Sequence, residues 1–86
     1  MDDLVAFLRA RLDEDERYLN SNRRHLWTDR PLREVALKRT VLVHCQMLID
    51  GTAEGTVADR HRAVDVLGSL AAVYSDHPDY QENWKR

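Results

Sequence analysis

Five side chains of the kinds that ligate transition metals are spread along the chain: His25, His44, Cys45, His61 and His77. None of the spacings typical of zinc sites, such as C-x-x-C or H-E-x-x-H, is present. His44 and Cys45 are adjacent in a segment with helical periodicity, where consecutive side chains point about 100° apart and do not readily share one ion. A site would require His44 and His61 to meet across two helices. Metal binding is therefore the second alternative, and no cofactor is expected.

Cys45 is the only thiol, and the neighbouring His44 suggests an activated nucleophile. Activation needs an aligned hydrogen bond between thiol and base, which consecutive helical residues do not offer. An apolar position in mid-helix also raises the pKa of a thiol. The carboxylates fall at expected helix ends and outer faces, and the three glycines form no phosphate-binding loop. We therefore expect no enzymatic activity, with Cys45 buried as a small apolar side chain and His44 at the edge of the core.

Charge is distributed unevenly, although the net charge is only −2. Residues 1–16 hold six acids and two bases, residues 17–39 hold two acids and seven bases, and residues 40–86 hold seven acids and four bases. A basic middle that contains Trp27 would suit phosphate, so nucleic-acid binding through residues 17–39 is the first alternative function. The acidic stretch 13–16 lies close by in sequence, however, where it would neutralise some of these bases and repel a polyanion. No helix-turn-helix spacing is evident.

Arginine and aromatic side chains outside the helical stripes favour a protein contact instead. The expected contact residues are Arg23, Arg24, Trp27 and Arg30, followed by Tyr80 and Trp84. Two questions remain open. Trp27 either folds back with Leu26 to cap one end of the core or stays partly exposed beside the arginines as a contact. Tyr80 and Trp84, at i and i+4, either dock on the body of the domain or form an exposed aromatic recognition tail. The expected function is a small non-enzymatic interaction domain that acts as an adaptor, inhibitor or phage-encoded modulator. The identity of its protein partner is open, and so is self-association.

Three helical segments must position these side chains. Apolar periodicity predicts helices at about 2–19, 32–50 and 57–75, and Pro78 starts a short helical turn at about 79–84. Thr56 and Asp59 have the spacing of a capping box, and Gly51 is a helix stop. The fold class that follows is all-α, a three-helix bundle with a short C-terminal helical turn. At 86 residues, the chain is expected to form a single helical domain.

The segment 32–50 is expected to lie at the centre of the bundle. One apolar stripe on it consists of Val35, Leu42, Cys45 and Ile49, and a second, about 100° away, consists of Leu37, Val41, His44 and Leu48. Two stripes predict a wide buried face, as on a helix that packs against two neighbours. The first helix carries a single stripe: Leu4, Leu8, Leu12 and Leu19.

Composition indicates the compartment. One cysteine allows no internal disulfide, which fits a reducing environment. The chain starts with acidic residues and a short apolar run, unlike a signal peptide, and no apolar run approaches the roughly 20 residues of a membrane span. We expect a cytoplasmic protein that does not interact with a membrane.

Three stretches resemble a known family: the opening MDDLVAFLRARLDEDE, the mid-chain LREVALKR and the closing AAVYSDHPDYQENW. Together they are similar to small actinobacterial and actinophage proteins described only as a domain of unknown function. The resemblance implies a cytoplasmic actinobacterial or phage origin and brings no activity and no functional residue. Members of this family often carry further Cys and His residues between the second and third helical parts. The corresponding stretch here, IDGTAEGTVADRHR, has no Cys, so a metal there is not implied for this chain.

Overall fold

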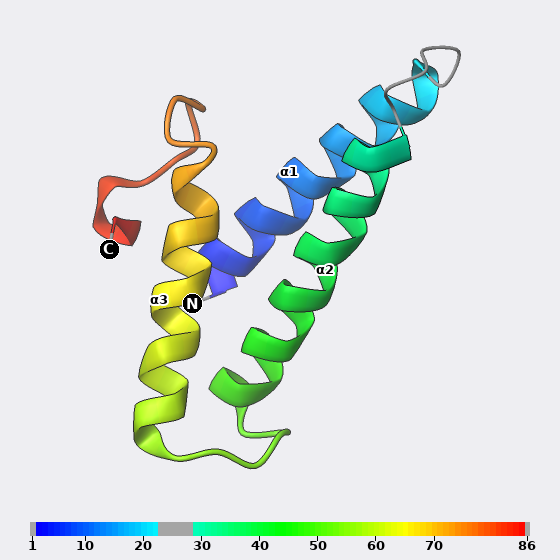
Figure 1. Cartoon of the computed structure of the whole chain (residues 1–86). Helices are drawn as coiled ribbons and strands as arrows, with labels where there is room; N and C mark the ends of the chain where they lie inside the picture. The colour runs from blue at the N-terminus through cyan, green and yellow to red at the C-terminus, as the bar shows by residue number, and fades with distance from the viewer. Residues whose placement is uncertain (1, 23–28, 86) are drawn as a thin grey trace.

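The structure, a computed structural model that describes residues 2–22 and 29–85, is all-α (Figure 1). In chain order the elements are α1 (Asp2–Ser21), α2 (Asp29–Asp50), α3 (Val57–Ala72) and a short 3₁₀ turn, η1 (Glu82–Trp84). No strand occurs in the described ranges. The predicted three-helix bundle with a short C-terminal helical turn is confirmed. Among the same residues, no helix is both long enough and apolar enough to cross a membrane.

The ends of the helices follow from local chemistry. Gly51 has a φ of 80°, a left-handed conformation that ends α2. The predicted capping box is present, because the Thr56 hydroxyl accepts the Asp59 backbone N–H at 3.1 Å and Asp59 Oδ2 accepts the Thr56 N–H at 2.9 Å. Three predicted boundaries were wrong: α2 begins at Asp29, α3 ends at Ala72, and the helical turn covers only Glu82–Trp84.

As expected, α2 packs against both other helices, while the first three turns of α1 supply the most deeply buried side chains of the core. Leu4, Leu8 and Leu12 recur every four residues and are at most 1% exposed. Leu67 of α3 is also fully buried. The small residues Ala63, Gly68 and Ala71 of α3 are buried as well, which allows close contact between helices. More side chains of α1 than of α2 are therefore buried, and the buried residues of α2 form one stripe.

That single buried stripe on α2 is the first of the two predicted ones. Val35, Leu42 and Cys45 are buried and Ile49 is partly buried. The second stripe was wrong in part, because Leu37 is 63% exposed and His44 is exposed, while Val41 and Leu48 are partly buried. The physical reason is geometric: α2 contacts both α1 and α3, but Leu37 and His44 lie on the part of its circumference that faces solvent.

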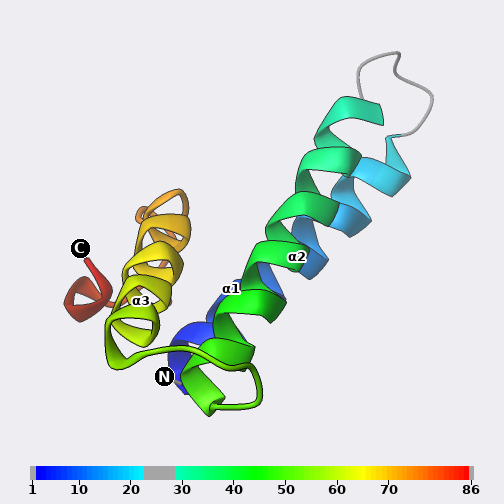
Figure 2. The same cartoon turned by 60° about the horizontal axis from the view of Figure 1, so that its bottom comes forward.

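The molecule is elongated because α1 and α2 form an antiparallel hairpin that extends past α3 (Figure 2). Its principal extents are 45 × 28 × 16 Å and its radius of gyration is 14.0 Å, against about 12 Å for a compact chain of this length. Ion pairs join the two helices of the hairpin: Arg39 of α2 lies 2.7 Å from Asp13 and 2.8 Å from Glu16 of α1. Among the described residues, two helices, α1 and α2, cover the apolar side chains at the far end of the hairpin.

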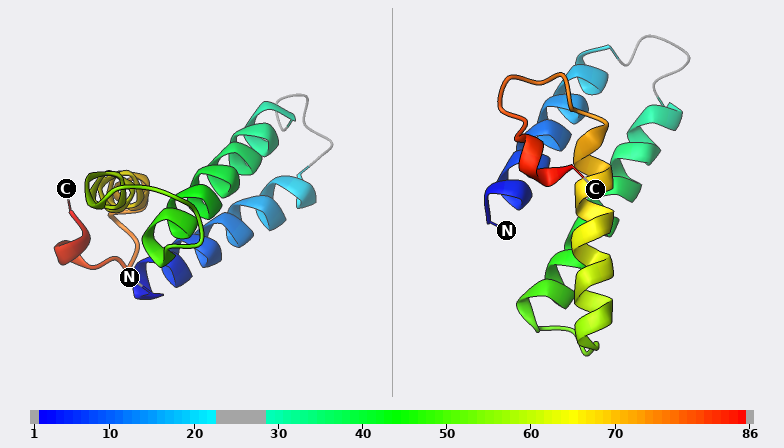
Figure 3. Two further views of the ribbon diagram at one scale, coloured as in Figure 1. Left: turned by 90° about the horizontal axis from the view of Figure 1, so that it is seen from below. Right: turned by 90° about the vertical axis from the view of Figure 1, so that its left-hand side faces the viewer.

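The C-terminal segment lies against α1 and α3 rather than extending into solvent (Figure 3, right). Trp84 is 7% exposed, and its ring lies 4.9 Å from that of Phe7. Tyr80 is half-buried, 6.2 Å from Phe7 and 5.7 Å from Trp84 between ring centroids. This confirms the docking that the i, i+4 spacing of the two aromatic residues suggested.

Candidate functional site

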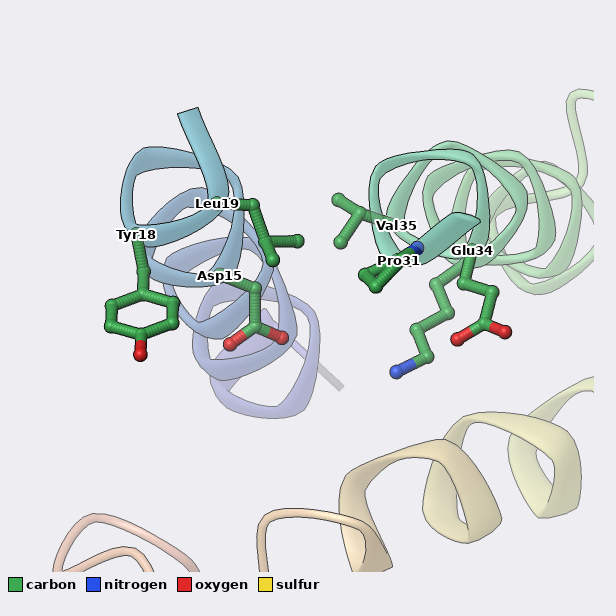
Figure 4. A pocket seen from close by; sticks show the side chains of 7 residues that line it. Asp15, Tyr18, Leu19, Pro31, Glu34 and Val35 are labelled. Atoms are coloured by element: carbon green, nitrogen blue, oxygen red, sulfur yellow. The ribbon is translucent and has the colours of Figure 1, made fainter. Parts of the chain in front are cut away.

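A groove of about 200 Å³ lies between the C-terminal end of α1 and the N-terminal end of α2. Its lining residues are Asp15, Tyr18, Leu19, Pro31, Glu34, Val35 and Lys38. Figure 4 shows Leu19 turned toward α2 and Val35 and Pro31 turned toward α1, which gives the groove an apolar floor. The Tyr18 ring is 70% exposed and stands at one edge, with the Glu34 carboxylate at the other. We call this site the hairpin groove.

Two polar side chains of the hairpin groove are held by Tyr74, which follows the C-terminal end of α3. The Tyr74 hydroxyl donates a hydrogen bond of 2.7 Å to Oδ2 of Asp15. The Lys38 ammonium lies 5.8 Å from the centre of the Tyr74 ring, within cation–π range. Asp15 and Lys38 are therefore held in place, whereas Tyr18 and Glu34 remain available at the surface.

The Tyr74 hydrogen bond predicts a specific loss of stability in alkali. Burial, and then the hydrogen bond to Asp15, raise the pKa of Tyr74, while the nearby Arg11 lowers it. The stabilisation is complete below the unfolded-state pKa of about 10 and is lost as pH rises through the raised folded-state pKa. Wild type should therefore lose stability above about pH 10 more steeply than Tyr74→Phe, which keeps the ring and lacks the titrating hydroxyl. Urea midpoints of both proteins, measured by circular dichroism between about pH 8 and pH 11, would test this. Midpoints of wild type and Tyr74→Phe that change equally with pH would contradict it.

The basic middle of the chain is partly neutralised within the fold. Arg39 is engaged by Asp13 and Glu16, as the proximity of the acidic stretch suggested, and these carboxylates raise the pKa of its guanidinium. Arg30 pairs with Glu34 at 3.2 Å, but its side chain is 87% exposed, so this pair is weak. A polyanion would meet paired arginines and the carboxylates of Asp15 and Glu34 on this side of the hairpin.

The predicted contact residues are not all brought together. Arg30 lies at the rim of the hairpin groove through its ion pair with Glu34. Arg23, Arg24 and Trp27 lie outside the described residues, so their role stays a prediction. Tyr80 and Trp84 belong to the aromatic cluster around Phe7, far along the chain from the groove, and the burial of Trp84 leaves little of its indole for a partner.

A buried arginine links α1 to the segment after α3. Arg11 is 8% exposed, packs over the Phe7 ring at 5.2 Å and forms a 2.9 Å ion pair with Glu14. Its Nη1 donates to Nδ1 of His77 at 2.9 Å, and the Asp79 backbone N–H donates to the same nitrogen at 3.0 Å. The geometry gives Arg11 and His77 a structural role in holding the C-terminal segment.

The metal and nucleophile hypotheses gain no support from the geometry. Within the ranges 2–22 and 29–85, no group of three or more His, Cys, Asp or Glu side chains is placed to hold a metal ion; His25 lies outside these ranges. Cys45 is buried as predicted, and its burial raises the pKa of the thiol, which disfavours the reactive thiolate. His44 is exposed rather than at the edge of the core.

Sequence reasoning missed the hairpin groove. Tyr18 lies within the predicted first helix but belongs to no predicted apolar stripe. The available signal was weak: an aromatic residue next to Leu19 at the end of an amphipathic helix, and Pro31 at the start of the next. Both features become a site only once the antiparallel hairpin places residues 15–19 opposite residues 31–38.

The sequence profile of a family of unknown function (DUF6221) matches residues 21–86, which is more than half of the chain. These residues include the mid-chain and closing stretches that carried the resemblance, and they leave out the opening stretch. No curated protein and no solved structure matches the chain.

Proposed function

The chain belongs to the family of unknown function DUF6221, and from its geometry we propose that it is a non-enzymatic protein-interaction domain whose hairpin groove receives an apolar side chain of a partner protein. The observation that carries this proposal is the exposed Tyr18 beside an apolar floor. Tyrosine and arginine at the edge of a concave apolar site are the residue types that dominate binding energy at protein interfaces. An adaptor, an inhibitor and a phage-encoded modulator are roles that such a groove would serve.

The chemistry of the groove defines the partner segment. Leu19, Pro31 and Val35 favour an aliphatic or aromatic side chain of modest size, consistent with the volume of about 200 Å³. Arg30 extends beside the groove with its side chain 87% exposed and only a surface pair to Glu34. A carboxylate next to the apolar residue of the partner would displace Glu34 and bind Arg30. We therefore assign an apolar side chain flanked by an acidic one.

Nucleic acid fits this side of the hairpin less well. Asp15 and Glu34 line the groove, and Arg39 already binds two carboxylates. The cytoplasmic location and the actinobacterial or phage origin implied by the resemblance are part of the proposal, together with the sequence-based contacts at Arg23, Arg24 and Trp27.

The test is selection from a displayed peptide library on the whole domain. Enriched peptides should share an apolar residue next to Asp or Glu. Their binding should weaken about tenfold or more in Tyr18→Ala, as expected for an interface tyrosine worth at least about 1.4 kcal/mol. Val57→Ala is the matched control, because Val57 is 61% exposed on α3 and does not line the groove. Arg30→Glu should also weaken binding, whereas Arg62→Glu, at another highly exposed side chain, should not.

Three results would overturn the proposal. One is the absence of any enriched peptide motif. Another is peptides that bind Tyr18→Ala as tightly as wild type. The third is tight binding of a labelled oligonucleotide that falls steeply as salt rises, which would establish the nucleic-acid alternative instead.

A further inference from the structure

The solvent-facing side of α2 is unusually free of charge. From Ala36 to Met47 it presents Ala36, Leu37, Thr40, Val43, His44 and Met47, all of them exposed and none an acid, a lysine or an arginine. Val43 is 49% and Met47 40% exposed. Outer faces of surface helices normally carry charged residues, so an apolar stripe opposite the core needs a separate explanation.

The spacing of this stripe is that of a coiled coil. Residues alternate at three and four positions, the a and d pattern, along one side of α2: Arg33, Ala36, Thr40, Val43, Met47 and Asp50. We call this set the outer seam. The buried stripe against α1 and α3 has the same alternation, with Val35, Lys38, Leu42, Cys45 and Ile49. α2 therefore carries two seams on opposite sides, and only one of them has a partner helix among the described residues.

The ends of the outer seam are oppositely charged and exposed. Arg33 stands at its N-terminal end and Asp50 at its C-terminal end, and neither forms an ion pair with another described residue. If two α2 helices pair antiparallel about a two-fold axis, Arg33 of each copy lies opposite Asp50 of the other. The same register places Ala36 opposite Met47 and Thr40 opposite Val43, so that small residues face larger ones. A parallel pair would instead place like charges together at both ends.

We propose that two copies of this chain associate through the outer seams of their α2 helices, antiparallel and in the register that pairs Arg33 with Asp50. A two-fold axis would place Arg33 of each copy opposite Asp50 of the other. This self-complementary charge pattern identifies a second copy of the chain as the partner of the outer seam. Ala36 and Thr40 are small enough for close approach of the helices. The seam is short and contains Thr40, so the dimer is a reversible one that depends on concentration.

Sedimentation equilibrium of the full chain, from about 10 µM to about 1 mM, tests the association directly. Wild type should pass from monomer toward dimer across this range. Val43→Glu places two carboxylates in the seam and should weaken association at least about tenfold. Val66→Glu is the matched control, because Val66 is 43% exposed on α3, and it should leave association unchanged. Circular dichroism would establish that each variant remains folded.

A charge swap tests the register. Arg33→Asp alone should weaken the dimer, because two carboxylates then face each other at each end, and Arg33→Asp combined with Asp50→Arg should restore it. A wild-type chain that stays monomeric up to about 1 mM, or a dimer insensitive to Val43→Glu, would overturn the proposal. Failure of the double variant to restore association would overturn the antiparallel register. Because Tyr18 and Arg30 are not in the outer seam, Tyr18→Ala should leave the dimer intact, and the two proposals can fail separately.

Discussion

Replacing Phe7 with alanine is expected to release the C-terminal segment and to remove a large share of the stability of the domain. Phe7 is 6% exposed, and its ring contacts the rings of four residues after α3: Tyr74, His77, Tyr80 and Trp84. Truncating a buried phenylalanine costs about 3–5 kcal/mol. A chain of 86 residues has about 4–13 kcal/mol in total. One substitution therefore removes a large share of the free energy of unfolding.

The measurement combines urea unfolding with fluorescence from a single tryptophan. In a Trp27→Phe background Trp84 is the only indole, so its emission reports the docked segment alone. Phe7→Ala should shift this emission to the red, toward that of solvated indole, and lower the urea midpoint. Phe7→Leu fills more of the space left by the ring than Phe7→Ala does. It should keep the domain folded, with a smaller red shift of the Trp84 emission and a smaller decrease of the urea midpoint. Val57→Ala is the exposed control. Emission from Trp84 that stays unchanged in Phe7→Ala would contradict a central role for this ring.

Some of this packing could be read from the sequence, because it depends on local spacing. The i, i+4 relation of Tyr80 and Trp84 correctly suggested docking, and the four-residue repeat of Leu4, Leu8 and Leu12 correctly marked the buried face of α1. The capping box could be predicted because Thr56 and Asp59 are three residues apart in the sequence. The ring that receives the C-terminal aromatic residues could not be identified from the sequence, since Phe7 is more than 70 positions away from Tyr80 and Trp84.

The hairpin groove and the pattern of burial on α2 could not be predicted from local sequence spacing, for a related reason. Periodicity shows which residues of a helix share a side, and it does not show on which sides the neighbouring helices lie. α2 has apolar residues around much of its circumference, so two neighbours on two sides was a reasonable inference. The structure does place both α1 and α3 against α2, yet it leaves Leu37 in solvent.

Leu37 and Leu42 provide the test of that arrangement, because the sequence assigned both to buried stripes. Leu42 is 2% exposed, so Leu42→Ala should cost about 2–5 kcal/mol through lost burial and a residual cavity. Leu37 is 63% exposed, so Leu37→Ala should change the free energy of unfolding by no more than about 0.5 kcal/mol. The two substitutions remove the same atoms from the same helix, and alanine has the higher helix propensity in both cases. The difference between them therefore measures burial alone.

Urea unfolding of both variants, followed by circular dichroism at a concentration of about 5 µM, where the proposed dimer is dissociated, isolates the effect on the monomer. Equal costs for Leu37→Ala and Leu42→Ala would mean that α2 is rotated about its axis, with its second stripe inside the bundle. The outer seam would then turn toward α1 or α3, and Val43 and Met47 would be unavailable to a second copy. A large cost at Leu42 with almost none at Leu37 would instead establish that α2 packs within the monomer on one side only, which is the condition that association through its other side requires.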